Sequence, residues 1–456
     1  MNIAFIPIDN RPVCYTLPEQ ICAVDRSMSL FLPDRNLLGD LTKYADAEKI
    51  LNWLENLDCV DAVILSLDTI AYGGLISSRR CSNTFEEIKQ RIHRLFKILE
   101  SKKSKVYAFS SIMRISNNNV NEEEKEYWNL WGKKIFEYSY NTHKLGKFEN
   151  DVPKEILDDY LKTRKRNFEI NKIYLEFQKR GLFSTLVFSK DDCAEYGLNV
   201  MEAQELEKLG GFVKTGADEI PLTLLARAVS DFNKKLSLKL KVAPIFLSPK
   251  DKSLISNYED VSIENSVKGQ LELAGCEICS HKDADILLYV NNFENRQGEI
   301  VMKIPTKPYE GEWSKQDKPY MIADVRFANG SDNSFVKKLF GNDLEQFDDN
   351  FYGYSAWNTS ANTLGSLICT AVVKFYSNIS STFSPLSFKK LQVVRFIDDW
   401  AYQANVRQEL AMPDEDLIKQ KMRPFEKLIF EKLGVNFNTS YKFPWDRLFE
   451  VEVELS

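Results

Sequence analysis

The sequence predicts an α/β protein with two parallel-sheet units. Short runs rich in β-branched and aromatic residues alternate with amphipathic stretches of helical length, which is typical of parallel sheets with crossover helices. The 456 residues are more than one hydrophobic core usually holds together, so we expect several domains. These are a catalytic domain over residues 1–240, a second α/β domain over 241–385, and a tail of helices and an edge strand over 386–456.

The first domain contains six predicted strands separated by stretches that can cross back over a sheet. The strands are residues 3–8, 30–33, 62–67, 106–112, 185–189 and 212–215. The helices are residues 17–23, 45–56, 84–101 and 200–209. This order fits either an open parallel sheet or a TIM-barrel-like unit. Residues 121–182 are rich in Glu, Lys, Asn and Tyr and predict a helical insertion, which either covers the active edge as a lid or pads the sheet.

The second domain repeats the alternation and predicts a doubly wound unit of the Rossmann or flavodoxin type. Its strands are residues 242–247, 277–279, 286–290 and 320–323, and its helices are residues 267–274, 334–340 and 362–376. The alternative is that the strands near 242 and 286 complete an eight-stranded barrel begun at residue 3. The tail begins with a long helix through Phe396 and Arg407 and ends with an alternating edge strand over 449–455.

Composition and charge exclude several classes of protein. A net charge of −6 and a pI near 5.5 give no electrostatic reason to expect a nucleic acid or an anionic membrane as partner. The first residues lack a basic region followed by an apolar run, and no apolar stretch approaches the roughly 20 residues that span a bilayer. We therefore expect a cytoplasmic protein that acts on a small molecule, with its oligomeric state left open.

The cofactor expectations follow from motifs that the sequence lacks. Its eight cysteines include a single C-x-x-C pair, Cys276 and Cys279, which predicts neither a zinc site nor a redox site. The sequence has neither G-x-G-x-x-G nor a Walker-type phosphate loop, so a nucleotide cofactor is not expected. With only three histidines, proton transfer falls to carboxylates, tyrosine or lysine. We expect no cofactor, with a divalent metal as the alternative.

Acids and arginines follow one predicted strand after another. In open parallel sheets and in barrels alike, the carboxyl ends of the strands meet at the edge where ligands bind. The candidates at this edge of the first domain are Asp9, Asn10, Arg11, Asp68, Tyr72, Arg114, Asp191, Asp192, Asp218 and Glu219.

The adjacent carboxyls Asp191 and Asp192 are the strongest indication of a catalytic site in the sequence. Two neighbouring acids repel each other, which raises one pKa so that this group can donate a proton. Asp68 is the third catalytic candidate, because no helix is expected directly after it and the glycines at 73 and 74 let the backbone approach a ligand.

The remaining candidates of this edge are expected to bind substrate. Arg11 and Arg114 offer bidentate recognition of a carboxylate or phosphate, although Arg114 alternatively neutralises the acids around it. Asp218 and Glu219 alternatively start a helix, where the dipole favours acids.

Two segments of the second domain predict further substrate contacts. Asp324 and Asn329 follow the strand at 320–323. Trp357 and Asn358 combine a ring that can stack on a sugar with an amide that can bind its hydroxyls. The alternative is that Asn358 and the next residue, Thr359, cap the apolar helix that follows.

Four motifs together resemble an uncharacterised bacterial family of unknown function, a likeness that runs to about Arg407. They are the DNRP run at 9–12, LDT with YGG at 67–74, GADE at 216–219 and WNT with NTLG at 357–365. The resemblance brings no activity with it. Separately, the loop at 188–192 is similar to the paired aspartates of substrate-assisted N-acetylhexosaminidases. That second likeness implies that Asp191 polarises an acetamido group and that Asp192 is the acid/base.

Many acids, few histidines and aromatic segments beside amides favour a glycosidase-type hydrolase with carboxylate acid/base catalysis. The first alternative is a metal-dependent hydrolase or lyase on a small anionic substrate, with Asp9, Asp68, Asp191 and Asp218 ligating Mg²⁺, Mn²⁺ or Ca²⁺. The second alternative is a protein that binds a small ligand without turnover.

Overall fold

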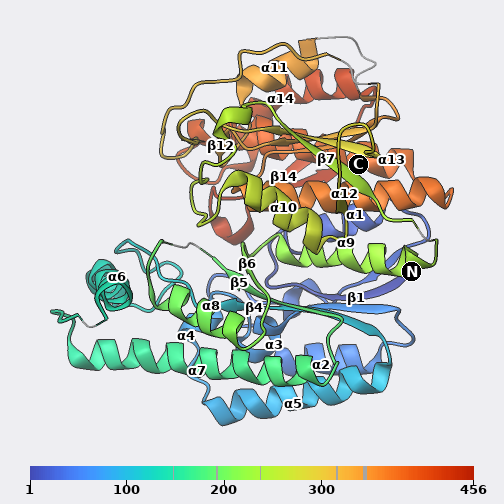
Figure 1. Cartoon of the computed structure of the whole chain (residues 1–456). Coiled ribbons are helices and arrows are strands. Elements are labelled where there is room, and N and C mark those ends of the chain that lie inside the picture. Colours follow the sequence, from blue (N-terminus) through green and yellow to red (C-terminus); the bar gives the residue numbers. More distant parts are fainter. Residues whose placement is uncertain (147, 192–193, 237, 315–316, 342–346) are drawn as a thin grey trace. The chain divides into compact units, whose positions relative to one another are not determined.

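The computed structural model describes residues 1–146, 148–191, 194–236, 238–314, 317–341 and 347–456 (Figure 1). These residues form two compact units that are each assembled from several chain segments. The first unit comprises Met1–Tyr15, Leu30–Leu224 and Tyr258–Asp260. The second comprises Thr16–Ser29, Leu225–Asn257 and Val261–Ser456.

The first unit contains a six-stranded sheet of order β2-β1-β3-β4-β5-β6. The strands are β1 (Asn2–Ile6), β2 (Ser29–Phe31), β3 (Ala62–Ser66), β4 (Lys105–Ile112), β5 (Thr185–Lys190) and β6 (Val213–Thr215). The pairs from β1 through β6 are parallel. The chain goes from β1 out to β2 and returns on the other side of β1 as β3. The strand order therefore reverses between β1 and β3, the arrangement that places ligand sites in doubly wound sheets.

One side of this sheet is covered by a layer of helices, which line the lower side of the sheet in Figure 1. They are α2 (Ala47–Asn56), α3 (Leu67–Tyr72), α5 (Phe85–Lys102), α7 (Lys154–Lys179) and α8 (Leu198–Lys208). Every residue of β3 is buried, as expected for a strand inside a parallel sheet. The start of α5 is fixed by a capping box, in which Thr84 and Glu87 satisfy each other's backbone N–H groups.

The expected insertion contains two helices with different surroundings. Residues Ile170, Tyr174 and Phe177 of α7 belong to the main core, so this helix is part of the layer that covers the sheet. Helix α6 (Trp128–Leu145) instead packs in a separate small core with Met113 and Tyr160. The crossover from β4 to β5 thus supplies a core helix together with a peripheral one.

The second unit contains a five-stranded parallel sheet of order β13-β11-β9-β7-β8. The strands are β7 (Lys241–Phe246), β8 (Glu277–Ile278), β9 (Ile286–Asn291), β11 (Tyr320–Asp324) and β13 (Phe351–Ser355). Counted along the chain, this is the order 2-1-3-4-5 of flavodoxin-like sheets. The expectation of a doubly wound second unit is confirmed. Helix α12 (Ser360–Ile379), nearly all of it buried, packs on β11 and β13 and against α10 (Ile263–Leu273).

The barrel alternative is wrong. Strands β7 and β9 pair with each other in the second sheet instead of continuing the first. Over the described residues both sheets are open, and the first ends in the edge strands β2 and β6. Each of these is three residues long and partly exposed, so they are too short to extend the sheet into a closed ring.

Two local expectations are also wrong. Helix α3 starts at Leu67, directly after β3, because the side chain of Ser66 caps it by accepting the N–H of Thr69. The helix of the tail does not run on to Arg407 as one α-helix: α13 (Pro385–Arg395) passes into a π-helical segment, Phe396–Tyr402. The final strand β15 (Glu452–Leu455) pairs antiparallel with β14 (Thr439–Lys442) in a two-stranded sheet.

Several other helices complete the fold. They are α1 (Thr16–Cys22), α4 (Ser77–Arg80), α9 (Ile220–Phe232), α11 (Asn333–Gly341) and α14 (Glu415–Leu433). Within the part of the chain that the structure describes, no helix is both long enough and apolar enough to cross a membrane.

The first core predicts the cost of truncating a central residue. Leu65 lies in β3 and is fully buried, so Leu65→Ala should lower the free energy of unfolding by about 2–5 kcal/mol. Leu130→Ala is the matched control, because that side chain is 75% exposed, and it should change the free energy by less than about 0.5 kcal/mol. Urea denaturation of both variants measures the difference, and equal costs would contradict the assigned core.

Candidate functional site

A buried arginine joins the loop after β1 to the loop after β6. Arg11 Nε lies 2.9 Å and Nη2 2.8 Å from Asp9 Oδ2. On its other side, Arg11 Nη1 lies 3.1 Å from Asp218 Oδ2 and Nη2 lies 2.5 Å from Asp218 Oδ1. Arg11 thus binds two carboxylates, and the pairing with Asp218 is bidentate. The exposed fraction of each of the three side chains is 10% or less.

A second arginine gathers acids at the ends of β4 and β5. Arg114 Nη2 lies 2.8 Å from Glu123 Oε2, and its Nε lies 3.3 Å from Glu124 Oε1. Its Nη1 lies 3.3 Å from Asp191 Oδ2. In this structure Arg114 therefore pairs with neighbouring acids, as the alternative interpretation of this residue predicts.

The third arginine, Arg79, is a residue that the sequence analysis missed. It belongs to the short helix α4, and its side chain is 2% exposed. Its Nη2 lies 3.5 Å from Glu123 Oε2 and its Nε lies 3.5 Å from Glu124 Oε1. The neighbouring Arg80 binds the backbone carbonyl groups of residues 121, 122 and 124 and so fixes the loop that carries both acids. The only signal in the sequence is the arginine pair at 79–80, which follows no strand.

The two arginine groups form one electrostatic cluster. Burial raises the pKa of Asp191, and the charges of Asp218 and Glu123 raise it further, while Arg114 opposes the shift. Burial likewise raises the pKa of Asp218, with the charge of Asp9 adding to the shift and Arg11 opposing it. The charge of Asp218 therefore disfavours the ionised form of Asp191, an arrangement that favours a proton on Asp191.

Glu219 is a fully buried acid next to this cluster. Burial, followed by the charges of Asp218 and Glu259, raises its pKa to about 8. The backbone N–H of Ala217 donates to Glu219 Oε2 at 3.1 Å. Helix α9 begins at the next residue. Glu219 therefore also lies at the start of a helix, which was the alternative prediction for this residue. The raised pKa favours the protonated form of this carboxyl at neutral pH.

The remaining strand-end candidates of the first unit have local partners. Asp68 is fully buried: its Oδ2 accepts the N–H of Ser111 at 2.8 Å and its Oδ1 accepts the hydroxyl of Ser110 at 3.2 Å. Burial raises the pKa of Asp68 to about 6. Among the described residues it forms no hydrogen bond or ion pair with the three arginines. Tyr72 is 2% exposed, with the guanidinium of Arg166 5.5 Å from its ring centre.

The loops around these residues are held by backbone contacts. Asn10 donates its backbone N–H to the carbonyl of Gly39 at 3.1 Å and accepts a bond from Arg35 Nε at 2.9 Å. A Cβ atom on Gly73 would lie 2.9 Å from Tyr44 Cβ, and one on Gly74 would lie 3.1 Å from the carbonyl oxygen of Ile8. The two glycines thus allow the chain to approach itself. Asp192, which the sequence predicts to be catalytic, lies outside the described residues.

The candidates at 324 and 329 belong to the second unit and are occupied by local contacts. Asp324 is fully buried and accepts bonds from Asn291 Nδ2, the N–H of Asp332 and the hydroxyl of Tyr354. Asn329 donates from Nδ2 to Glu299 Oε1 at 2.6 Å.

The aromatic segment at 357–359 is also buried in the second unit. The Trp357 ring is 3% exposed and packs edge-on against Phe449 at 6.4 Å. The carbonyl of Asn358 accepts the N–H of Asn329 at 2.7 Å, and Thr359 caps α12. Since stacking on a sugar requires an exposed ring face, the present packing of Trp357 offers no such platform.

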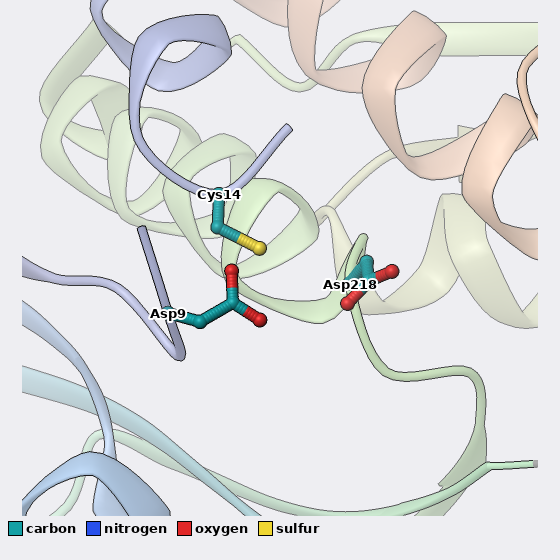
Figure 2. Close-up of side chains that lie close together, drawn as sticks. All are labelled: Asp9, Cys14 and Asp218. Carbon is teal, nitrogen blue, oxygen red and sulfur yellow. The ribbon is translucent and has the colours of Figure 1, made fainter. Parts of the chain in front are cut away.

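One group of possible metal ligands lies within the Arg11 cluster (Figure 2). One ligand atom each from Asp9, Cys14 and Asp218 lies within 4.8 Å of the others. Arg11 already binds both carboxylates, and its Nη2 lies 3.9 Å from Cys14 Sγ. The guanidinium thus holds the position that a cation between these ligands would take.

The family model described as "Protein of unknown function (DUF4127)" matches residues 3–454. The chain belongs to this family. The resemblance drawn from the four motifs is confirmed, and the match extends beyond Arg407 to nearly the whole chain. No curated protein matches significantly.

Among solved structures, one weak match is the dinucleotide-forming acetyl-coenzyme A synthetase 1 of Ca. Korarchaeum cryptofilum, in complex with phosphate and ADP. The sequences are 10% identical over 83% of this chain and 97% of that one. The TM-score is 0.16, too low to support a common fold.

Gly216 is predicted to be necessary for the position of Glu219. A Cβ atom on Gly216 would lie 1.7 Å from Glu219 Oε1, and its φ of +115° disfavours a side chain. Gly216→Ala should therefore displace the buried carboxyl from the Ala217 N–H. Gly210→Ala is the matched control, because its φ is +93° and a Cβ atom there meets no other atom within 4 Å. We expect Gly216→Ala to cost about 1–3 kcal/mol more than this control in urea denaturation, and equal costs would contradict the clash.

The raised pKa of Glu219 predicts a pH dependence of stability. The folded state keeps this proton up to about pH 8, whereas the unfolded chain releases it near pH 4.5. The folded state therefore binds more protons across this window, and the free energy of unfolding falls as pH rises, by on the order of 1 kcal/mol per unit. Glu219→Gln should reduce this slope in urea denaturation between pH 5 and pH 8. The exposed Glu207→Gln should leave the slope as in wild type, and an unchanged slope in Glu219→Gln would refute the assignment.

Proposed function

We propose that this chain is a hydrolase of the glycosidase type, in which carboxyl groups held by arginines carry out acid/base catalysis on a sugar-containing substrate. The observation that carries the proposal is the pair Asp191 and Asp218. They follow the neighbouring strands β5 and β6, each binds its own arginine, burial raises the pKa of both, and the charge of Asp218 raises that of Asp191 further. A proton shared between two such carboxyls supplies an acid and a base at the same pH.

The contacts of the two carboxyls support a different role for each. Asp218 is bound by two nitrogens of Arg11, at 2.5 and 3.1 Å, which stabilises its ionised form. Asp191 lies farther from its arginine, 3.3 Å from Arg114 Nη1, and its side chain is 25% exposed. The proton therefore resides on Asp191, which donates it to the leaving-group oxygen. Asp218 accepts a proton from the attacking water.

The second candidate function is a metal-dependent hydrolase or lyase. The grouping of Asp9, Cys14 and Asp218 favours it, because one ligand atom from each lies within 4.8 Å of the others, close enough for a single ion to bind all three (Figure 2). The position of Arg11 weighs against it, since a divalent ion between the two carboxylates would meet the guanidinium charge. This candidate requires Arg11 to move before the metal binds.

Hydrolysis of a panel of aryl glycosides tests the proposal. The panel contains neutral, N-acetylated, phosphorylated and uronic-acid sugars, each assayed with and without EDTA. Asp191→Asn and Asp218→Asn should each lower kcat about 10²–10⁴-fold, and EDTA should have no effect. Asp34→Asn is the control, because Asp34 also follows a strand but is exposed and caps the short helix Arg35–Leu37.

Other outcomes would favour the competing functions. Turnover that EDTA abolishes and Mn²⁺ restores would support the metal-dependent hydrolase. Turnover that survives both substitutions would remove Asp191 and Asp218 from the mechanism. Thermal stabilisation by a sugar without any turnover would indicate a binding protein.

A further inference from the structure

Two arginines of the cluster share the same two carboxylates. Glu123 Oε2 lies 2.8 Å from Arg114 Nη2 and 3.5 Å from Arg79 Nη2. Glu124 Oε1 lies 3.3 Å from Arg114 Nε and 3.5 Å from Arg79 Nε. Each acid thus bridges two guanidinium groups, whose positive charges would otherwise repel each other. The pair of arginines is a carboxylate-binding site that the chain fills with its own side chains.

Two nitrogen atoms of Arg79, Nε and Nη2, form no hydrogen bond through these contacts. Its side chain is 2% exposed, yet neither Nε nor Nη2 donates a hydrogen bond within the described part of the chain. At 3.5 Å the two glutamates attract its charge but lie beyond the usual length of an N–H···O bond. Buried donors without an acceptor destabilise the folded protein. A ligand oxygen that reached Arg79 would recover this energy.

Glu123 is the acid that a ligand can replace. Its side chain is 25% exposed, whereas that of Glu124 is 6% exposed. The loop carrying both acids is held through its backbone, because Arg80 Nε donates to the carbonyl of Glu124 at 3.0 Å and Nη2 to that of Asn121 at 3.0 Å. The side chain of Glu123 can therefore swing away while the loop stays in place.

We propose that the substrate is an acidic sugar of the uronic-acid type, whose carboxylate displaces Glu123 and binds Arg114 and Arg79. The inference rests on the proposed glycosidase function and names its substrate class. Exchange of one carboxylate for another leaves the charge of the cluster unchanged. A phosphate dianion would instead add negative charge beside Asp191, and a neutral sugar would bring no charge to replace that of Glu123.

The same geometry connects binding with the chemistry. Arg114 contacts Glu123 through Nη2 and Asp191 through Nη1. A substrate carboxylate in the place of Glu123 is therefore held by the same guanidinium that contacts the proposed acid. This positions the sugar ring beside Asp191 before the glycosidic oxygen is protonated.

Binding to the intact protein tests the inference without requiring turnover. Isothermal titration calorimetry with D-glucuronate, D-glucose and inorganic phosphate is carried out on wild type, Glu123→Gln, Arg79→Lys and Glu126→Gln. Glu123→Gln should bind glucuronate at least about 10-fold more tightly than wild type, because the competing carboxylate is gone. Arg79→Lys should bind it at least about 10-fold more weakly, because lysine lacks the planar fork. Glu126→Gln is the matched control: this neighbouring acid is exposed and should bind as wild type.

Three outcomes would overturn the proposal. They are equal binding of glucose and glucuronate, unchanged glucuronate affinity in Glu123→Gln, and tighter binding of phosphate than of glucuronate. If circular dichroism shows that Arg79→Lys does not fold, the glucuronate affinity of Glu123→Gln relative to wild type still tests the proposal. Glucuronate binding that depends on Glu123, without hydrolysis of any aryl glycoside of the panel, would refute the glycosidase function and leave the carboxylate site. Asp191-dependent hydrolysis of neutral glycosides without glucuronate binding would refute the carboxylate site alone.

Discussion

The bridge from Asp9 through Arg11 to Asp218 holds together loops that are more than 200 residues apart in the chain. All three groups are buried, so each charge depends on the others for compensation. Removing one partner of a buried pair typically costs about 3–5 kcal/mol, because the remaining charge loses both water and counter-charge. Burial is the main cause of the raised pKa of Asp218, Asp9 adds to it and Arg11 opposes it, and the charge of Asp218 in turn raises the pKa of Asp191. At this edge of the first sheet, the protonation of one charged group therefore affects that of the others.

Comparison of the two sheets separates structural polar groups from functional candidates. In the second unit, Arg326 is 1% exposed and donates to Asn291, Ser248 and the carbonyl of Lys307. Its partners surround it, so the group is satisfied within the chain. Arg79 in the first unit is equally buried, but its Nε and Nη2 lack acceptors in the described part of the chain. Arg79 has two such nitrogens, whereas Arg395 of the second unit has one, its Nε, and binds Asp398 and Asp399 through its other nitrogens. A buried polar group without a partner calls for an explanation, and a bound ligand is one.

The sequence was sufficient to predict those site residues that directly follow parallel strands. Asp9, Arg11, Arg114, Asp191 and Asp218 could be predicted to meet because residues after parallel strands share one edge. Open sheet and barrel could not be told apart, since both have the same alternation of strands and helices and differ only in whether the edge strands pair. Arg79, Glu123 and Glu124 could not be found, because they reach the site from a short helix and a loop. Their positions depend on tertiary contacts made by Arg80.

The two units are interleaved along the chain. Residues 16–29 belong to the second unit although both neighbouring segments belong to the first, and Tyr258–Asp260 belongs to the first within a stretch of the second. The short segment is tied to the first sheet by Asp260, which binds Lys190 and Thr215. No single cut in the gene therefore yields either unit whole. After ribosomal synthesis of the first 224 residues both units are still incomplete: the first lacks Tyr258–Asp260, and the second lacks most of its residues.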